Sequence, residues 1–243
     1  MNELDFTGQT ALVVGGTSGI GNAIARAFRD RGATVTVWGT RAAPEDYAGD
    51  EGSDLSGLHY AQVDVSDPSA IAAAALPDRL DVLVCSQGTV LYKRQEFTAA
   101  GWDKVMAVNV GSVMHVAQAC YPLLKASGGR VVVVTSVASF RATMGTPAYA
   151  ASKTAAMGLV RTLGQAWAGD GIRVNALAPS LVDTKLTKAT FDHPERRDKA
   201  LAKIPLGRFA EAEEMANVAL FLASPLSSYV VGQTLLVDGG LTL

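Results

Sequence analysis

Three side chains near the middle of the chain carry chemistry at a fixed spacing: a hydroxyl, a phenol and an amine. Ser136, Tyr149 and Lys153 lie in the stretch TSVASFRATMGTPAYAASK. Tyr149 and Lys153 are four residues apart, which places them on one face of a helix. A free phenol titrates at about pH 10, and a nearby ammonium group lowers that pKa. With the serine hydroxyl beside the phenol, the three groups could converge on one carbonyl or alcohol oxygen.

These residues need elements that hold them together, and the chain alternates between strand and helix patterns. Apolar, β-branched runs recur as TALVV, TVTVW, HYAQVDV, DVLVC, RVVVVTS, RVNALAP and TLLVDGG. Their continuous apolar character is typical of strands buried on both faces of a parallel sheet. Helical patterns lie between them at about 20–28, 98–126, 148–168 and 211–223. The alternation predicts an α/β fold with a doubly wound parallel sheet, whose ligands bind beyond the carboxyl ends of the strands.

A glycine-rich segment joins the first strand to the first helix. Gly15, Gly19 and Gly21 form a G-x-x-x-G-x-G pattern within VVGGTSGIG. Missing side chains let the backbone turn tightly and approach a phosphate, and the helix that follows offers free N–H groups and a partial positive charge. The pattern therefore predicts nucleotide binding in preference to a plain tight turn.

The end of the second strand bears on which nucleotide binds. An acidic side chain there would favour NAD by accepting hydrogen bonds from a ribose 2′-hydroxyl. The chain has Gly39, Thr40 and Arg41 instead, and Arg41 could bind a 2′-phosphate. NADP(H) is therefore favoured over NAD(H), although Arg41 could also be a solvated loop residue. Asp64, after the third strand, could accept a hydrogen bond from an adenine amino group or mark a helix N-terminus.

Composition weighs against several other classes of function. The chain has 243 residues, of which 49% are apolar and 18% charged, and its net charge is −2. This balance is typical of a globular protein and disfavours nucleic acid or an anionic membrane as the main partner. His59, His115 and His193 share no metal-ligand spacing, so no metal is expected, and two cysteines cannot build a disulfide framework. Without a leader sequence or a membrane-length apolar run, we expect a cytoplasmic protein.

Together these segments resemble the short-chain dehydrogenase/reductase family over nearly the whole chain. The resemblance rests on GGTSGIG, DV at 64–65, VNV around Asn109, Ser136, YAASK, RVNALAP and the terminal VGQTLLVDGG. It implies a single Rossmann-like domain over residues 1–243 with about seven strands, assembled as a homotetramer, with a dimer as the alternative. It also implies an NAD(P)-dependent oxidoreductase that moves a hydride between nicotinamide and a carbonyl or secondary alcohol carbon.

The resemblance implies a role for each catalytic residue. Tyr149 would be the general acid/base, and Lys153 would lower its pKa and bind the nicotinamide ribose. Ser136 would orient the substrate oxygen, and Asn109 would hold a water in the proton relay. The expected cofactor-binding residues are Gly15, Thr17, Ser18, Gly19, Ile20, Gly21, Thr40, Arg41, Asp64, Val65, Ser86, Gly88, Tyr149, Lys153, Pro179, Val182 and Thr184.

The chain departs from the family pattern at four points. Val14 replaces a threonine before the first glycine, and CSQG at 85–88 replaces NNAG. Ser180 replaces the glycine after Pro179, and Ser18 stands where NADP-preferring members often have a basic residue. None of these changes removes a catalytic group, so they bear on cofactor geometry and preference more than on activity.

We expect the segment 180–208 to form the loop that binds the substrate. Its sequence is similar to L-xylulose and small-dicarbonyl reductases, sugar-acid dehydrogenases and 3-oxoacyl carrier-protein reductases. Further pocket residues are expected at Gln87, Thr89, Val90, Ala138, Met144 and Ser180. This mix of apolar and neutral polar side chains favours a small neutral ketone, sugar, polyol or hydroxy compound. Two alternatives stay open: a cofactor-binding sensor or scaffold without catalysis, and an epimerase or dehydratase with bound NAD.

Overall fold

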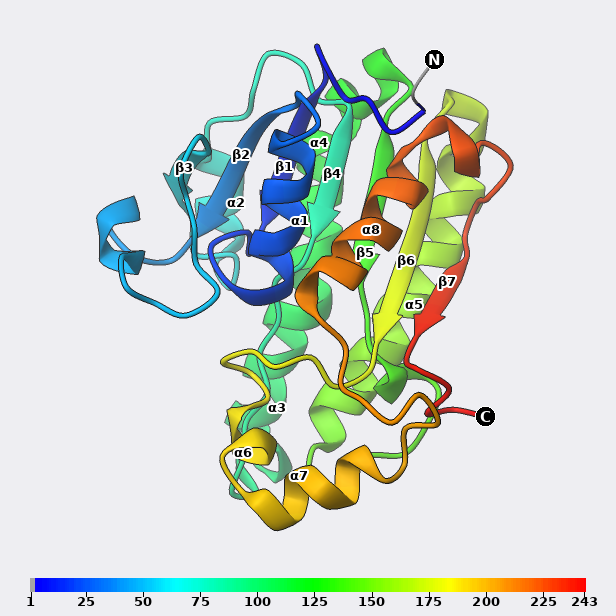
Figure 1. The fold of residues 1–243 in the computed structure, drawn as a ribbon. Helices are drawn as coiled ribbons and strands as arrows, with labels where there is room; N and C mark the ends of the chain where they lie inside the picture. Colours follow the sequence, from blue (N-terminus) through cyan, green and yellow to red (C-terminus); the bar gives the residue numbers. More distant parts are fainter. Residues whose placement is uncertain (1–2) are drawn as a thin grey trace.

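The computed structural model describes residues 3–243. Its strands form one seven-stranded sheet (Figure 1). In space the strands follow the order β3-β2-β1-β4-β5-β6-β7, and every neighbouring pair is parallel. The chain therefore reverses its winding direction between β1 and β4, which confirms the predicted doubly wound sheet. The strands are β1 (Thr10–Val14), β2 (Thr34–Gly39), β3 (His59–Gln62), β4 (Val82–Cys85), β5 (Arg130–Val134), β6 (Arg173–Pro179) and β7 (Thr234–Val237).

Helices cover both faces of the sheet, which explains why the central strands are apolar throughout. On one face α1 (Gly19–Arg29) and α8 (Ala212–Ala223) pack over an apolar core. On the other face α2 (Pro68–Ala73), α4 (Ser112–Ser127) and α5 (Pro147–Trp167) cover a second core. Burial on both sides removes the apolar–polar alternation that a strand with one solvated face would show.

The helix expected over 98–126 is interrupted by an irregular turn. α3 (Ala99–Met106) passes through a π-helical turn at Ala107–Gly111 into α4. Such turns break the regular backbone ladder and are frequent at functional sites. Asn109 lies inside this turn, so the irregularity coincides with one of the predicted catalytic residues.

The segment 180–208 folds into two short helices, α6 (Lys188–Phe191) and α7 (Pro194–Leu201). Figure 1 shows them beyond the carboxyl ends of the strands, at the lower edge of the view. The helices expected at 148–168 and 211–223 are α5 and α8. Within residues 3–243, no helix combines the length and apolar character that a membrane span requires. Short 3-10 turns lie at Pro44–Tyr47, Gln95–Phe97, Val137–Ser139, Ala168–Asp170 and Pro225–Ser227.

Candidate active site

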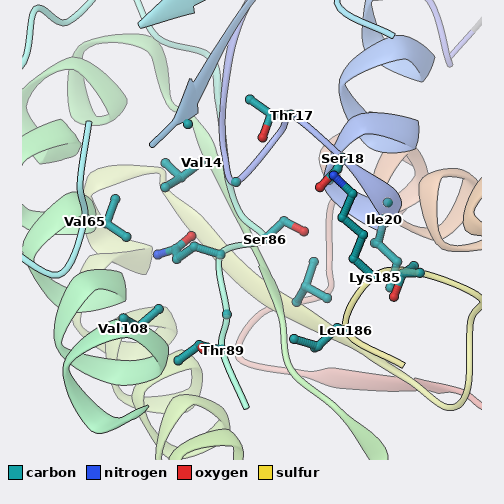
Figure 2. A pocket seen from close by; sticks show the side chains of 18 of the residues that line it. Val14, Thr17, Ser18, Ile20, Val65, Ser86, Thr89, Val108, Lys185 and Leu186 are labelled. Atoms are coloured by element: carbon teal, nitrogen blue, oxygen red, sulfur yellow. The ribbon is translucent and has the colours of Figure 1, made fainter. Parts of the chain in front are cut away.

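A cavity of about 570 Å³ opens at the carboxyl edge of the sheet (Figure 2). The glycine-rich loop forms one wall, and the segments that follow five further strands complete the lining. The structure thus gathers residues that are far apart in the sequence at the edge where parallel sheets bind ligands. Predicted residues in the lining are Gly15, Thr17, Ser18, Gly19, Ile20, Gly21, Thr40, Asp64, Val65, Ser86, Gln87, Gly88, Thr89, Ser136, Tyr149, Lys153, Pro179, Ser180, Val182 and Thr184.

Ser136, Tyr149 and Lys153 enter this cavity from two elements. Ser136 follows β5, and its Oγ accepts a hydrogen bond from the Ala138 N–H at 3.1 Å. Tyr149 and Lys153 lie one turn apart near the start of α5, with Lys153 Nζ 5.8 Å from the centre of the Tyr149 ring. The Ser136 hydroxyl lies near the Tyr149 phenol and acts on its pKa as a hydrogen-bonding neighbour. The structure therefore brings the three predicted groups together.

Burial governs the protonation of the phenol and the amine. It raises the pKa of the Tyr149 phenol, and the hydrogen bond with Ser136 acts in the opposite direction. The neighbouring Tyr92 and Glu96 raise the same pKa further. Burial lowers the pKa of the Lys153 amine to about 8. The pKa of the phenol is raised overall, so the lowering expected from Lys153 stays a prediction.

The glycine-rich loop packs its backbone closely against itself and against the segment that follows β4. A Cβ on Gly21 would lie 2.1 Å from the Gly15 carbonyl oxygen, and a Cβ on Gly15 would lie 2.8 Å from the Gln87 nitrogen. Gly15 and Gly19 have φ angles of 73° and 54°, in the left-handed region that glycine adopts readily. Because α1 begins at Gly19, its positive end faces the cavity. This cradle fits a phosphate group.

Gly21→Ala is expected to weaken dinucleotide binding about tenfold or more and to lower the unfolding temperature. The new methyl group would overlap a backbone carbonyl that cannot swing away, and overpacking of this kind costs about 1–3 kcal/mol. Fluorescence titration with NADPH and thermal unfolding measure the two effects. The matched control is Gly158→Ala in α5, where a Cβ meets nothing within 4 Å and should stabilise the helix slightly. Equal binding by both variants would contradict the crowding argument.

Two residues of the lining each carry a buried polar atom that has no partner within the described residues: Trp38 at Nε1 and Gln87 at Oε1. Gln87 Nε2 donates to Ser112 Oγ at 2.8 Å, which leaves the amide oxygen as the free end. Unsatisfied buried donors and acceptors are costly, and a bound ligand or water removes that cost. A dinucleotide carries hydroxyl and amide groups of the required kind. The open cradle and these two atoms therefore fit NAD(P).

Asn109 braces the site from outside the cavity lining. It is 1% exposed, and its Oδ1 accepts a hydrogen bond from the Thr89 N–H at 2.8 Å. Its Nδ2 donates to the Thr89 carbonyl at 3.0 Å and to Ser152 Oγ at 2.9 Å. Both amide protons are thus engaged by the protein, and the water expected at this residue stays a prediction. The side chain ties the segment after β4 to α5.

Arg41 also lies outside the lining, although Thr40 is part of it. The Arg41 guanidinium pairs with the Asp50 carboxylate at 2.7 Å and lies 4.4 Å from the centre of the Tyr47 ring. Asp50 also pairs with Lys185, which does line the cavity. The Asp50 carboxylate would therefore compete with a 2′-phosphate for the Arg41 guanidinium.

Three expected substrate-pocket residues do not reach the cavity: Val90, Ala138 and Met144. Ala138 is buried, and its backbone N–H donates a hydrogen bond to Ser136 Oγ. Met144 is fully exposed, because the stretch before α5 turns outward into solvent. Spacing along the chain placed these residues near the catalytic groups, whereas the course of the loop directs them elsewhere.

Sequence reasoning missed several lining residues. Figure 2 shows Lys185 and Leu186 on the side of the cavity opposite Val65 and Val108. For Lys185 and Leu186 the sequence did carry a signal, because both lie in the expected substrate segment 180–208. Trp38 carried no signal, because within a buried strand it reads as an ordinary core residue. The missed residues are Val14, Trp38, Gly39, Val63, Ser66, Lys104, Val108, Val134, Thr135, Lys185, Leu186 and Thr187.

Several known proteins are similar to this chain in sequence and in fold. A family model described as enoyl-(acyl carrier protein) reductase matches residues 14–242. The 3-oxoacyl-(acyl-carrier-protein) reductase of Chlamydia trachomatis is 36% identical, over 96% of this chain and 97% of that protein. The chain belongs to the short-chain dehydrogenase/reductase family. This confirms the predicted Rossmann-like fold and makes the chain an NAD(P)-dependent oxidoreductase that acts on hydroxyl or keto groups.

Two further proteins that resemble this short-chain dehydrogenase/reductase carry the names of enzymes that act on sugar acids. The 2-dehydro-3-deoxy-D-gluconate 5-dehydrogenase of Bacillus subtilis is 36% identical, over 96% of this chain and 94% of that protein. A crystal structure from Agrobacterium tumefaciens is described as a putative 2-deoxy-D-gluconate 3-dehydrogenase with bound NADP. It matches with a TM-score of 0.89 and 34% identity over 99% of both chains. The family match therefore holds for sequence and fold together.

Proposed function

We propose that this enzyme interconverts a ketone and a secondary alcohol on a small hydroxylated substrate, with a keto sugar acid or polyol as the first class to test. The observation that carries the proposal is the meeting of the Ser136 and Tyr149 hydroxyls in the same cavity as the glycine-rich cradle. Thr184, Ser180 and Thr187 add hydroxyl groups to the lining, which suits a substrate with several hydroxyls. The sugar-acid enzymes among the similar proteins support the same class.

The proposed mechanism divides the work between substrate positioning and proton transfer. Bound nicotinamide supplies or accepts the hydride. The hydroxyls of Ser136 and Tyr149 hold the substrate oxygen, which fixes the reacting carbon in place. During reduction Tyr149 donates its proton to that oxygen, and during oxidation it accepts one. Lys153, whose Nζ donates to the Val134 carbonyl at 2.9 Å, keeps a positive charge close to the tyrosine when the phenolate forms.

The test is a turnover assay of the purified protein with each reduced and oxidised nicotinamide nucleotide. The panel contains a keto sugar acid, a tetritol, a small dicarbonyl and an acetoacetyl thioester, and the absorbance of reduced nicotinamide is followed. We expect turnover of the sugar acid or the polyol. Turnover of the thioester alone would replace this substrate class with an acyl one. Tight cofactor binding without turnover of any compound would favour a cofactor sensor.

We also propose that NADP(H) is preferred over NAD(H). The support is the absence of a carboxylate at Thr40 and Arg41 after β2, together with the NADP in the similar Agrobacterium structure. Arg41 would serve the 2′-phosphate once that phosphate replaces the Asp50 carboxylate.

Arg41→Ala is accordingly expected to weaken NADPH about tenfold or more and NADH very little, since a hydrogen bond to a charged group contributes about 1.5–3 kcal/mol. Asp50→Asn should have the opposite effect and tighten NADPH, because it releases the guanidinium. Tryptophan fluorescence reports the binding, because Trp38 lines the cavity. An equal loss for both nucleotides in Arg41→Ala would refute phosphate recognition by this residue.

We further propose that the chain is a single domain that assembles into a homotetramer, with a dimer as the alternative. Exposed apolar side chains at Leu226, Tyr229 and Leu236, on and near the edge strand β7, support an interface there. Size-exclusion chromatography with light scattering decides between the two assemblies. The cytoplasmic location stays a prediction.

A further inference from the structure

Glu96 is a buried carboxylate between the catalytic helix and the loop that follows β4. It lies in the 3-10 turn Gln95–Phe97 and is 1% exposed. Its Oε2 accepts a hydrogen bond from the Tyr149 N–H at 2.9 Å, and its Oε1 accepts one from the Leu91 N–H at 2.9 Å. A buried carboxylate is costly unless its oxygens are satisfied, and here each oxygen binds a backbone N–H.

The bond to Tyr149 supplies a cap that α5 lacks in its own sequence. The helix begins at Pro147, and Thr146 before it makes no side-chain capping bond. The first N–H groups of a helix have no partner within the helix, and the Tyr149 N–H is one of them. A carboxylate is a favourable acceptor there, because it faces the positive end of the helix. Glu96 thus holds the backbone of the catalytic tyrosine from 53 positions earlier in the chain.

The bond to Leu91 anchors the loop that forms the facing wall. Two residues before it, both backbone groups of Thr89 are held by Asn109. Thr89 itself lines the cavity. The stretch from Thr89 to Leu91 is therefore held at one end by Asn109 and at the other by Glu96, each 1% exposed.

The same loop also contacts the expected substrate segment 180–208 through Tyr92. The Tyr92 hydroxyl donates to the Leu186 carbonyl at 2.9 Å, and Leu186 lines the cavity. Lys93 and Arg94 then adopt φ angles of 54° and 61°, which are uncommon for residues other than glycine. The turn that leads to Glu96 is thus a strained conformation, and the two bonds of the carboxylate help to hold it.

The charge of Glu96 works against the chemistry of its neighbour. Burial is the main cause that raises the pKa of the Tyr149 phenol, and Glu96 adds to it together with Tyr92. The facing ammonium group is Lys153, 5.8 Å from the ring centre. A neutral side chain at position 96 would favour the phenolate more. The advantage of a carboxylate at this position is therefore geometric.

We propose that Glu96 is a positioning residue for the reaction: it sets Tyr149 on α5 at a fixed place relative to the substrate wall at 89–92. The proposal rests on the proposed role of Tyr149 as the acid/base. Misplacement of a reacting group by about 1 Å can cost roughly 10²-fold in rate. A brace that holds both sides of the cavity is therefore able to control turnover without contacting the substrate.

The test compares full-length Glu96→Gln and Glu96→Ala with the wild type, using the best substrate from the panel and NADPH. We expect kcat to fall roughly 10- to 100-fold and the NADPH dissociation constant to change less than about twofold. Glu96→Gln keeps one acceptor oxygen, so it should retain more activity than Glu96→Ala. In both variants the pH midpoint assigned to Tyr149 should move to lower pH, because the negative charge beside the phenol is gone.

The matched control is Glu213→Gln, which removes a carboxylate that is exposed on α8. Its kcat and pH profile should equal those of the wild type. A lower unfolding temperature with unchanged kcat and pH profile in Glu96→Gln would overturn the positioning role. If Glu96→Ala does not fold, Glu96→Gln has nearly the same size and still decides the question. Full turnover by Tyr149→Phe would refute the acid/base assignment, whereas normal Glu96 variants with an inactive Tyr149→Phe would refute only this inference.

Discussion

Tyr149→Phe is expected to lower kcat by about 10²- to 10⁴-fold, which is the contribution typical of a positioned acid or base. The substitution removes only the phenolic oxygen, which lies beside the Ser136 hydroxyl in the cavity. Phenylalanine fills the same partly buried space, so the packing at the start of α5 stays intact. The NADPH dissociation constant should therefore remain within about twofold of the wild type. Single-turnover kinetics and fluorescence titration measure the two quantities separately.

Tyr121→Phe provides the matched control. It removes the same atom from a phenol that donates to Asp170 at 2.6 Å, away from the cavity lining. Its kcat should be unchanged, and its stability should fall by no more than about 1.5 kcal/mol. A kcat within about threefold of the wild type for Tyr149→Phe would remove this residue from the proton-transfer step.

Lys153→Met is expected to lower kcat/KM about 10²-fold or more, because it takes away both the charge beside Tyr149 and a donor in the cofactor cavity. In the same variant the ligand-free protein should be more stable at about pH 7. Burial holds the pKa of Lys153 at about 8, against a value of 10.5 in the unfolded chain. Below pH 8 both states carry the proton, and the buried charge costs roughly 3 kcal/mol. That cost offsets or exceeds the roughly 1.5–3 kcal/mol that a hydrogen bond from a charged group contributes, here the bond to the Val134 carbonyl.

The pH dependence of this gain has a definite sign. Between pH 8 and 10.5 the folded wild type gives up the lysine proton before the unfolded chain does, so its stability rises with pH. Methionine carries no proton, so the advantage of the variant should shrink across this window and fade above it. Denaturant unfolding at about pH 7 and about pH 10 measures the difference. Lys199→Met, at an exposed position on α7, should show no such trend. A constant stability difference would contradict the buried charge.

Local pattern was enough to predict the fold and to single out three groups that meet in the cavity. The strands follow from continuous apolar runs such as DVLVC, because burial on both faces leaves no polar side. The glycine-rich turn follows from the lack of side chains between a strand and a helix. Tyr149 and Lys153 follow from helical spacing, which places residues four apart on one face. In each case the signal lies within a few neighbouring residues.

Only the tertiary structure revealed which polar groups meet across the site. Glu96 binds Tyr149 from another part of the chain, and Asp50 occupies the guanidinium of Arg41. Asn109 uses its amide for bracing, and Met144 turns into solvent. Such pairings depend on how loops cross in space, and no periodicity along the chain records them. Local spacing therefore determines which chemical groups are available, whereas packing decides their partners, their burial and their protonation.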